Sequence, residues 1–287
     1  MKWYIYSYII LILTKMSSYV FKNLDKEWDF DTLSGNPIIS MEDVENHPEI
    51  DWNHYYLSEN PSITWENVQQ HPEINWYHYS LSNNPNITME IVLTNPNITW
   101  NFSNLSANPG ITLDDIKNNP QIEWDFHSLS QNPNLTWEFI QEFPGPWNWV
   151  SISSHKCITW DIIQEYPDIE WDIDGLSGNP NITWKNVSET PDTDWNYRIL
   201  SSNPNITYKT IAHNFDHPWC NNAFLENPSV TPDMFERLGL SDREEISLNP
   251  NLTWNFIEDN PHFNWCYILL SVNKRITYED CDPYVLK

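Results

Sequence analysis

A spacing of 24 residues between Asn-Pro pairs constrains the fold of this chain more than any other feature. With the proline taken as position zero, successive units follow at 24 residues, except for one step of 23 and one of 22. The units begin at Pro37, Pro61, Pro85, Pro109, Pro133, Lys156, Pro180, Pro204, Pro228, Pro250 and Lys274. Such a period is typical of a solenoid, in which each repeat packs on its neighbours. It predicts about eleven repeats in one continuous array over 20–287.

The recurring columns of the repeat predict two short helices. Thr64 is a favourable N-cap, and Trp65 and Val68 lie three residues apart on one helical face. Pro72 ends this helix, because a proline pushes the preceding residue out of the α region. A second segment holds apolar residues three apart, as in Tyr197 and Leu200, and fits a 3₁₀ helix or a single α turn. The predicted fold class is all-α, an α-solenoid with two short helices per repeat.

A leucine-rich horseshoe is the alternative fold. Its repeats have a similar length, and the alternation in Ile-Thr-Trp is compatible with a short strand. The two prolines per repeat and the helix-start pattern after each threonine favour the helical solenoid instead.

The tryptophans are expected to form the core. The chain has 17 Trp, and most fall in two columns, four and fifteen residues after position zero. Helices this short are marginal in isolation, whereas a buried tryptophan removes about 150–250 Å² of surface from water. Stacked tryptophan columns therefore supply the stability that the helices lack.

The formal net charge of −26 limits the choice of partner. Binding to a nucleic-acid backbone requires clustered cations, so nucleic acid is excluded as a partner. The charge allows a basic protein partner, and it also keeps an aromatic-rich array in solution.

The N-terminal segment 1–19 stands apart from the array. Trp3 to Leu13 is an apolar run that is too short to cross a bilayer as a helix. It is interpreted as a segment packed on the first repeat or preceding a true start at Met16, with a signal or anchor as the other interpretation.

The cysteines Cys157, Cys220, Cys266 and Cys281 are widely spaced, which indicates reduced thiols.

The words Asn-Pro-Asn-Ile-Thr-Trp, the proline at eleven and the tryptophan at fifteen resemble a repeat family abundant in giant DNA viruses of the mimivirus type. The resemblance covers nearly the whole chain; it implies a viral origin, and with it a location in the host cytoplasm or the virion, but no activity. The pattern Leu-x-x-Asn-Pro is also similar to the leucine-rich repeat variant, in which α and 3₁₀ helices alternate. The tryptophan columns depart from that second family.

Two clusters contain residue types that bind metal ions. The acidic run from Asp168 to Gly175 resembles the start of a calcium loop, but Asn181 stands where the ligating glutamate belongs. His213, His217 and Cys220 have metal-ligand spacing but lack a fourth ligand. Neither cluster is expected to bind metal, and no cofactor is expected.

The candidate partner-binding residues are Lys185, Arg198 and Lys209. The column five after position zero is acidic in six repeats and then becomes Lys185 and Lys209, with Arg198 between them in sequence. A cation in the first turn of a helix opposes its dipole, so the fold does not require these lysines. They form either a binding patch or variation at a tolerant surface column.

The repeat is irregular in two places, around Pro144–Trp149 and in the unit after Pro228. Both are interpreted as hinges or bends. Together these features predict a non-enzymatic scaffold that binds another protein. A structural virion component is the first alternative, and an enzyme with a site at the irregular repeats is the second.

Overall fold

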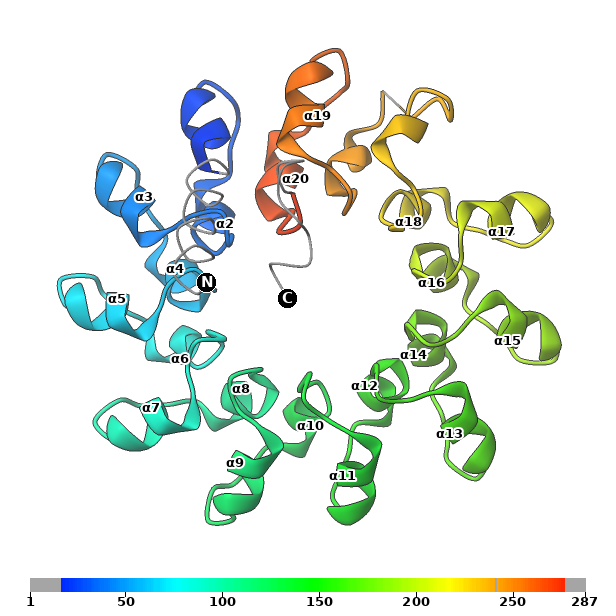
Figure 1. The fold of residues 1–287 in the computed structure, drawn as a ribbon, viewed down its shortest axis with the longest axis horizontal. Helices are drawn as coiled ribbons and strands as arrows, with labels where there is room; N and C mark the ends of the chain where they lie inside the picture. The colour runs from blue at the N-terminus through cyan, green and yellow to red at the C-terminus, as the bar shows by residue number, and fades with distance from the viewer. Residues whose placement is uncertain (1–16, 241, 277–287) are drawn as a thin grey trace, which may run out of the picture. The chain divides into compact units, whose positions relative to one another are not determined.

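The computed structural model describes residues 17–240 and 242–276, and in these two stretches the regular structure is helical, with no strand. Short helices alternate along the chain in the order that the repeat predicts (Figure 1). The all-α fold class is therefore confirmed, and the horseshoe of short strands is wrong. The apolar run Trp3–Leu13 lies outside the described residues.

Each regular repeat of the described stretches contributes a first helix after the threonine (Ser40 in the first unit) and a second helix before the next Asn-Pro. The first helices are α3 (Met41–Asn46), α5 (Trp65–Gln70), α7 (Met89–Thr94), α9 (Leu113–Asn118), α11 (Trp137–Glu142), α13 (Trp160–Glu165), α15 (Trp184–Glu189), α17 (Tyr208–His213) and α19 (Trp254–Asp259). The second helices are α2 (Phe30–Ser34), α4 (His54–Glu59), α6 (His78–Leu81), α8 (Phe102–Ala107), α10 (Phe126–Leu129), α12 (Trp149–Ser154), α14 (Ile173–Gly178), α16 (Tyr197–Ser202), α18 (Asn221–Leu225) and α20 (Tyr267–Val272).

The first helix begins at the predicted threonine. In α5 the Thr64 hydroxyl accepts a hydrogen bond from the Asn67 backbone N–H at 3.2 Å, and the Asn67 side chain accepts from the Thr64 backbone N–H at 2.9 Å. The helix ends at Gln70, two residues before Pro72. This reciprocal pair satisfies two N–H groups that a helix start otherwise leaves without a partner.

The tryptophan at column fifteen closes the other end of the first helix. The indole N–H of Trp76 donates to the carbonyl of His71, the residue that follows α5, at 2.9 Å. Trp195 donates to the Thr190 hydroxyl instead. The backbone carbonyl five residues earlier is the acceptor for Trp28, Trp52, Trp100, Trp124, Trp171, Trp219 and Trp265. The column thus caps a helix as well as filling the core.

The asparagine of Asn-Pro joins each repeat to the one before it. The buried Asn203 side chain donates to the carbonyls of Ser177 and Asn179, both at 2.9 Å, and accepts from the Asn205 backbone N–H at 2.9 Å. We call this column the asparagine ladder. The described structure places in it Asn36, Asn60, Asn84, Asn108, Asn132, Asn179, Asn203, Asn227, Asn249 and Asn273. Because each side chain satisfies backbone groups of two repeats, the buried amide costs little.

The chain divides into two compact units, and each contains a buried apolar cluster. Of the described residues, unit 1 holds 17–77 with 230–240 and 242–276, and unit 2 holds 78–229. Within unit 2, Figure 1 shows the second helices side by side in one row and the first helices in another. Leu176, Ile182, Val187, Trp195, Leu200 and Ile206 form a buried cluster there. The prediction of one continuous array over 20–287 stays a prediction.

Within unit 1, the beginning of the array packs on its end, with α2 against α20 (Figure 1). The Asp29 backbone N–H donates to the Ser271 hydroxyl at 3.1 Å, and the Asn36 side chain donates to the Ser271 carbonyl at 2.9 Å. The helices α2 and α4 belong to consecutive repeats and are joined by the same pair of hydrogen bonds. The Asn53 backbone N–H donates to the Ser34 hydroxyl at 3.0 Å, and the Asn60 side chain donates to the Ser34 carbonyl at 2.8 Å. We call the α2–α20 contact the end junction. It reproduces a contact between sequence neighbours without a covalent connection.

The two irregular places have local explanations. At the 23-residue step the Trp147 indole donates to a carbonyl only four residues earlier, that of Phe143, because the loop is one residue shorter. A side chain at Gly145 would collide with the Phe126 ring. In the unit after Pro228, 3₁₀ helices at Pro232–Met234 and Glu244–Leu248 replace the α-helices, and Gly239 has a φ of +66°. The interpretation of either place as a hinge stays a prediction.

Candidate functional site

The three predicted binding residues lie on different rows of unit 2. Lys185 is in α15 and Lys209 in α17, two adjacent first helices, whereas Arg198 is in the second helix α16 (Figure 1). Lys185 is exposed and lies 3.9 Å from Glu189 on its own helix. The structure therefore places the two lysines in one row, as the repeat predicts, and assigns Arg198 to the other.

Arg198 lines a polar groove of about 640 Å³. The groove also carries Asp174, Asp194 and His217, and the His217 ring stacks on Tyr197 with ring centroids 4.7 Å apart. Asp174 accepts a hydrogen bond from the Asn196 side chain at 2.9 Å. Burial, with a contribution from Asp216, raises the pKa of Tyr197, so its hydroxyl remains protonated at neutral pH. This surface mixes charges of both signs around an aromatic pair.

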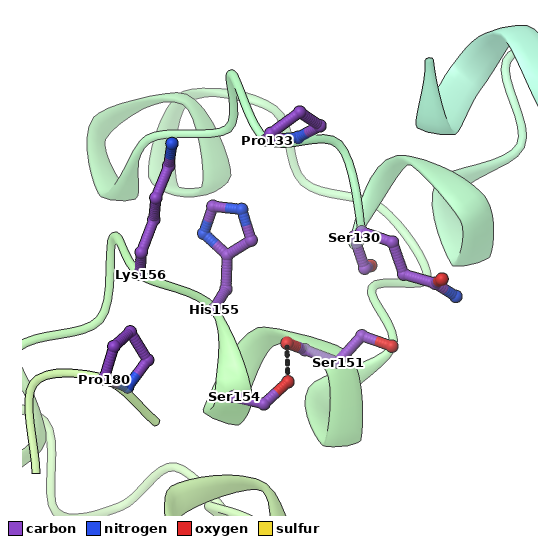
Figure 2. A pocket seen from close by; sticks show the side chains of 8 residues that line it. Ser130, Pro133, Ser151, Ser154, His155, Lys156 and Pro180 are labelled. Carbon is purple, nitrogen blue, oxygen red and sulfur yellow. Dashed lines mark hydrogen bonds between the residues drawn. The ribbon is translucent and has the colours of Figure 1, made fainter. Parts of the chain in front are cut away.

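A second groove, of about 520 Å³, lies at the 23-residue step (Figure 2). His155 and Lys156 stand there in place of Asn-Pro, beside the hydroxyl-bearing residues Ser151 and Ser154. Burial raises the pKa of the neighbouring Cys157 thiol to about 11, so it is protonated at neutral pH and is a poor nucleophile.

Several exposed apolar side chains lie on the second helices. In unit 2 they are Tyr79, Phe102 and Val150, on α6, α8 and α12, while Leu93 on the first helix α7 and Phe215 after α17 are exposed apolar side chains outside these helices. In unit 1 they are Tyr55, Tyr77, Ile268 and Val272, on or next to α4, α6 and α20. Tyr55 and Tyr77 contact each other edge to face, with centroids 5.8 Å apart. We call the exposed side of the second helices of unit 2 the second-helix face. Sequence reasoning missed it, because the column eighteen residues after position zero holds Tyr55 and Tyr79 but also Ser103, Asp174 and Arg198, and so shows no apolar pattern.

The acidic residues of the helices follow the other row. In unit 2 each first helix from α7 to α15 carries at least one acidic residue, whereas Asp174 is the acidic residue found within the second helices. The serines of the second helices are largely buried and hydrogen-bonded, as in Ser201, which donates to the Tyr197 carbonyl at 2.7 Å. The second-helix face therefore combines exposed apolar and polar side chains, and Asp174 is the carboxylate that the second helices of unit 2 contribute.

Side chains of the two clusters that contain metal-binding residue types make other contacts. Asp172 caps α14 by accepting from the Gly175 backbone N–H at 2.6 Å, and His213 contacts the Lys209 carbonyl at 2.6 Å through Nδ1. In the described stretches, no group of three or more His, Cys, Asp or Glu side chains is arranged to hold a metal ion. Cys157, Cys220 and Cys266 are free thiols. Among the residues that the structure covers, no helix has the length and apolarity to cross a membrane.

Comparison of the chain with protein-family models, curated proteins and solved structures finds no match.

Proposed function

We propose that the chain is a non-enzymatic scaffold that binds another protein through its second-helix face. The observation that carries the proposal is the separation of character between the two rows of helices. In unit 2, Tyr79, Phe102 and Val150 are exposed on second helices, Leu93 is the large apolar side chain exposed on a first helix, and carboxylates concentrate on the first helices. Exposed Tyr and Phe provide large contact areas at a low entropic cost, which is why they are enriched in protein interfaces.

The partner that fits this surface is a protein with an apolar contact region and a net positive charge. The formal charge of −26 attracts basic proteins over distances comparable with the Debye length. The second helices of unit 2 contribute one carboxylate, that of Asp174, which accepts a hydrogen bond from the Asn196 side chain, so a docking partner buries few unpaired carboxylates. Long-range attraction and short-range apolar contact therefore act on the same partner. The viral origin that the repeat words imply would make it a host or virion protein.

A non-catalytic role is supported by the two grooves. The thiol at the His155 groove is held protonated, and the His155 ring is occupied by hydrogen bonds to the backbone. In the Arg198 groove, His217 stacks on Tyr197, and Asp174 is bound to Asn196. Neither groove presents an activated nucleophile next to a free base.

Site-specific photo-crosslinking tests the proposal. A photoreactive side chain is introduced at Tyr79, Phe102 or Val150, and at Glu90 or Asp114 on the first helices as matched exposed controls. The full chain is then irradiated with the purified partner identified by co-purification. We expect crosslinks from the second-helix positions and not from the controls. Equal or stronger crosslinking from Glu90 and Asp114 would refute the assignment of the face.

Two further measurements identify the kind of partner. If the net charge attracts it, the association rate falls as salt is raised from low to physiological concentration. If the crosslinks instead join copies of this chain or virion coat proteins, the structural alternative is correct.

Substitution of Tyr79 and Val150 by serine should weaken binding at least tenfold while leaving thermal stability unchanged, because both side chains are exposed.

A further inference from the structure

One position of the asparagine ladder is occupied by a histidine. His155 precedes Lys156 in the unit whose position zero is Lys156, and Asn132 and Asn179 are the ladder residues of the adjacent repeats. Its ring is half-buried and lies at the groove of about 520 Å³ (Figure 2). The fold therefore uses an imidazole where the other ladder positions within 17–240 and 242–276 use an amide.

The imidazole reproduces both roles of the asparagine side chain. Its Nε2 lies 3.1 Å from the Asn132 carbonyl, and its Nδ1 accepts a hydrogen bond from the Cys157 backbone N–H at 3.2 Å. Asn203 makes the equivalent contacts with the Asn179 carbonyl and the Asn205 backbone N–H, both at 2.9 Å. These partners require the neutral tautomer with the proton on Nε2, because Nδ1 must accept.

An amide does not titrate near neutral pH, but an imidazole does. When Nδ1 is protonated it becomes a donor, and it then faces the Cys157 N–H, which is also a donor. The hydrogen bond between the two groups is therefore lost. We propose that the contact between the repeats of Asn132 and His155 is an acid-sensitive junction, which loosens when His155 is protonated at Nδ1.

The surroundings of the ring favour its neutral form. Burial lowers the pKa of His155, and the adjacent charge of Lys156 lowers it further, while the hydrogen bond to the Asn132 carbonyl opposes the shift. Ser130, Gln131, Pro133, Ser151, Ser154 and Pro180 complete the groove and carry no charge. Glu138 acts on the neighbouring Cys157, whose thiol is protonated at these pH values.

The direction of the pH dependence follows from this lowered pKa. Folding favours the neutral ring, so the stabilisation is fully present above the ordinary value of 6.5 and is lost as the pH falls through the folded value. Between the two values the equilibrium constant for local opening should rise by up to about tenfold per pH unit. The groove gives the charged ring room to reach water when the junction opens.

Amide hydrogen exchange of the full chain at pH 7.5, 6.5 and 5.5 tests this junction, with His155→Asn as the matched variant. This substitution installs the ladder residue of the adjacent repeats. Comparing wild type and variant at the same pH cancels the intrinsic dependence of exchange on pH. We expect the peptide containing the Cys157 amide to lose protection in the wild type as the pH falls, relative to the variant. The peptide containing Asn181, whose N–H donates to Asn179 at 2.7 Å, should behave identically in both proteins.

Identical pH dependence of the Cys157 peptide in the two proteins would overturn the proposal. An NMR titration of the His155 ring in the wild type is an independent measurement that does not require the variant to fold. A pKa below 6.5 with the proton on Nε2 supports the junction, and a value of 6.5 or higher overturns it. The outcome is independent of whether the second-helix face binds a protein.

Discussion

At the scale of single residues, the ladder asparagines do more than their place before a proline suggests. The sequence predicts that Asn-Pro separates one helix from the next. In the structure Asn203 is also buried, and it bridges the carbonyls of two residues from the preceding repeat. A buried polar group without a partner costs free energy, so these side chains determine how closely successive repeats approach.

Asn203→Ala should lower the free energy of unfolding by about 1–3 kcal/mol, because it leaves the Ser177 and Asn179 carbonyls and the Asn205 N–H without this partner. Urea denaturation followed by tryptophan fluorescence measures the change. The control is Asn83→Ala, an exposed asparagine next to the ladder residue Asn84, which should change stability by less than about 0.5 kcal/mol. Equal effects of the two substitutions would mean that the ladder adds nothing beyond a surface asparagine.

At the scale of the helix, the sequence predicts the interactions that form within one repeat. The threonine caps and the end of each first helix before its proline depend on residues three to seven positions apart, and they are found where expected. The bond from the column-fifteen tryptophan to the preceding carbonyl also lies within one repeat. It escaped prediction because the spacing identifies a buried ring but not the direction of its N–H group.

Thr183→Ala should lower the free energy of unfolding by about 1 kcal/mol, within a range of about 0.5–2 kcal/mol. The Thr183 hydroxyl and the Asn186 side chain cap α15 reciprocally, and the substitution removes one half of that pair. Thr183→Ser keeps the hydroxyl and should retain most of the stability. If serine and alanine destabilise equally, the loss comes from the methyl group and not from the cap.

The charge pattern on α15 and α17 gives a second prediction at this scale. The double substitution Lys185→Glu with Lys209→Glu should leave the melting temperature unchanged or slightly raised. Acidic side chains suit a helix start, while the new repulsion between residue 185 and Glu189 offsets part of the gain. Thermal unfolding by circular dichroism measures the effect. A clear drop in melting temperature would show that the lysines stabilise the fold, and unchanged stability with weaker binding of an acidic partner would support a binding patch.

At the scale of the whole molecule, the sequence predicts the period but not which distant repeats meet. Asp29 and Ser271 are 242 residues apart, and nothing in the recurring words distinguishes the first repeat from any other. The candidate site has the same limit. The period places Lys185 and Lys209 in one row of helices, but these residues were chosen because the charge of their column changes. The second-helix face becomes evident only once the exposure of each side chain is known.

The end junction should be the contact between repeats that opens most readily, since no covalent connection holds it. Ser271→Ala removes the acceptor of the Asp29 N–H and should increase hydrogen exchange in α2. Ser247→Ala is the matched control, because Ser247 accepts from the Cys266 N–H at 3.0 Å within the continuous chain. We expect a smaller increase in exchange at α20 for the control. Equal increases would show that chain continuity does not protect a junction.

The pairing of each ladder asparagine with a proline also affects how the protein ages chemically. Deamidation of asparagine usually begins when the backbone nitrogen of the next residue attacks the side-chain carbonyl, and a proline nitrogen has no proton to lose in that reaction. The ladder residues from Asn36 to Asn249 are all followed by proline, so the buried amides that hold the repeats together are shielded from conversion to aspartate. Asn273, which is followed by Lys274 and directly follows Ser271 and Val272 at the end junction, lacks this shield. Slow chemical damage to the ladder would therefore begin there.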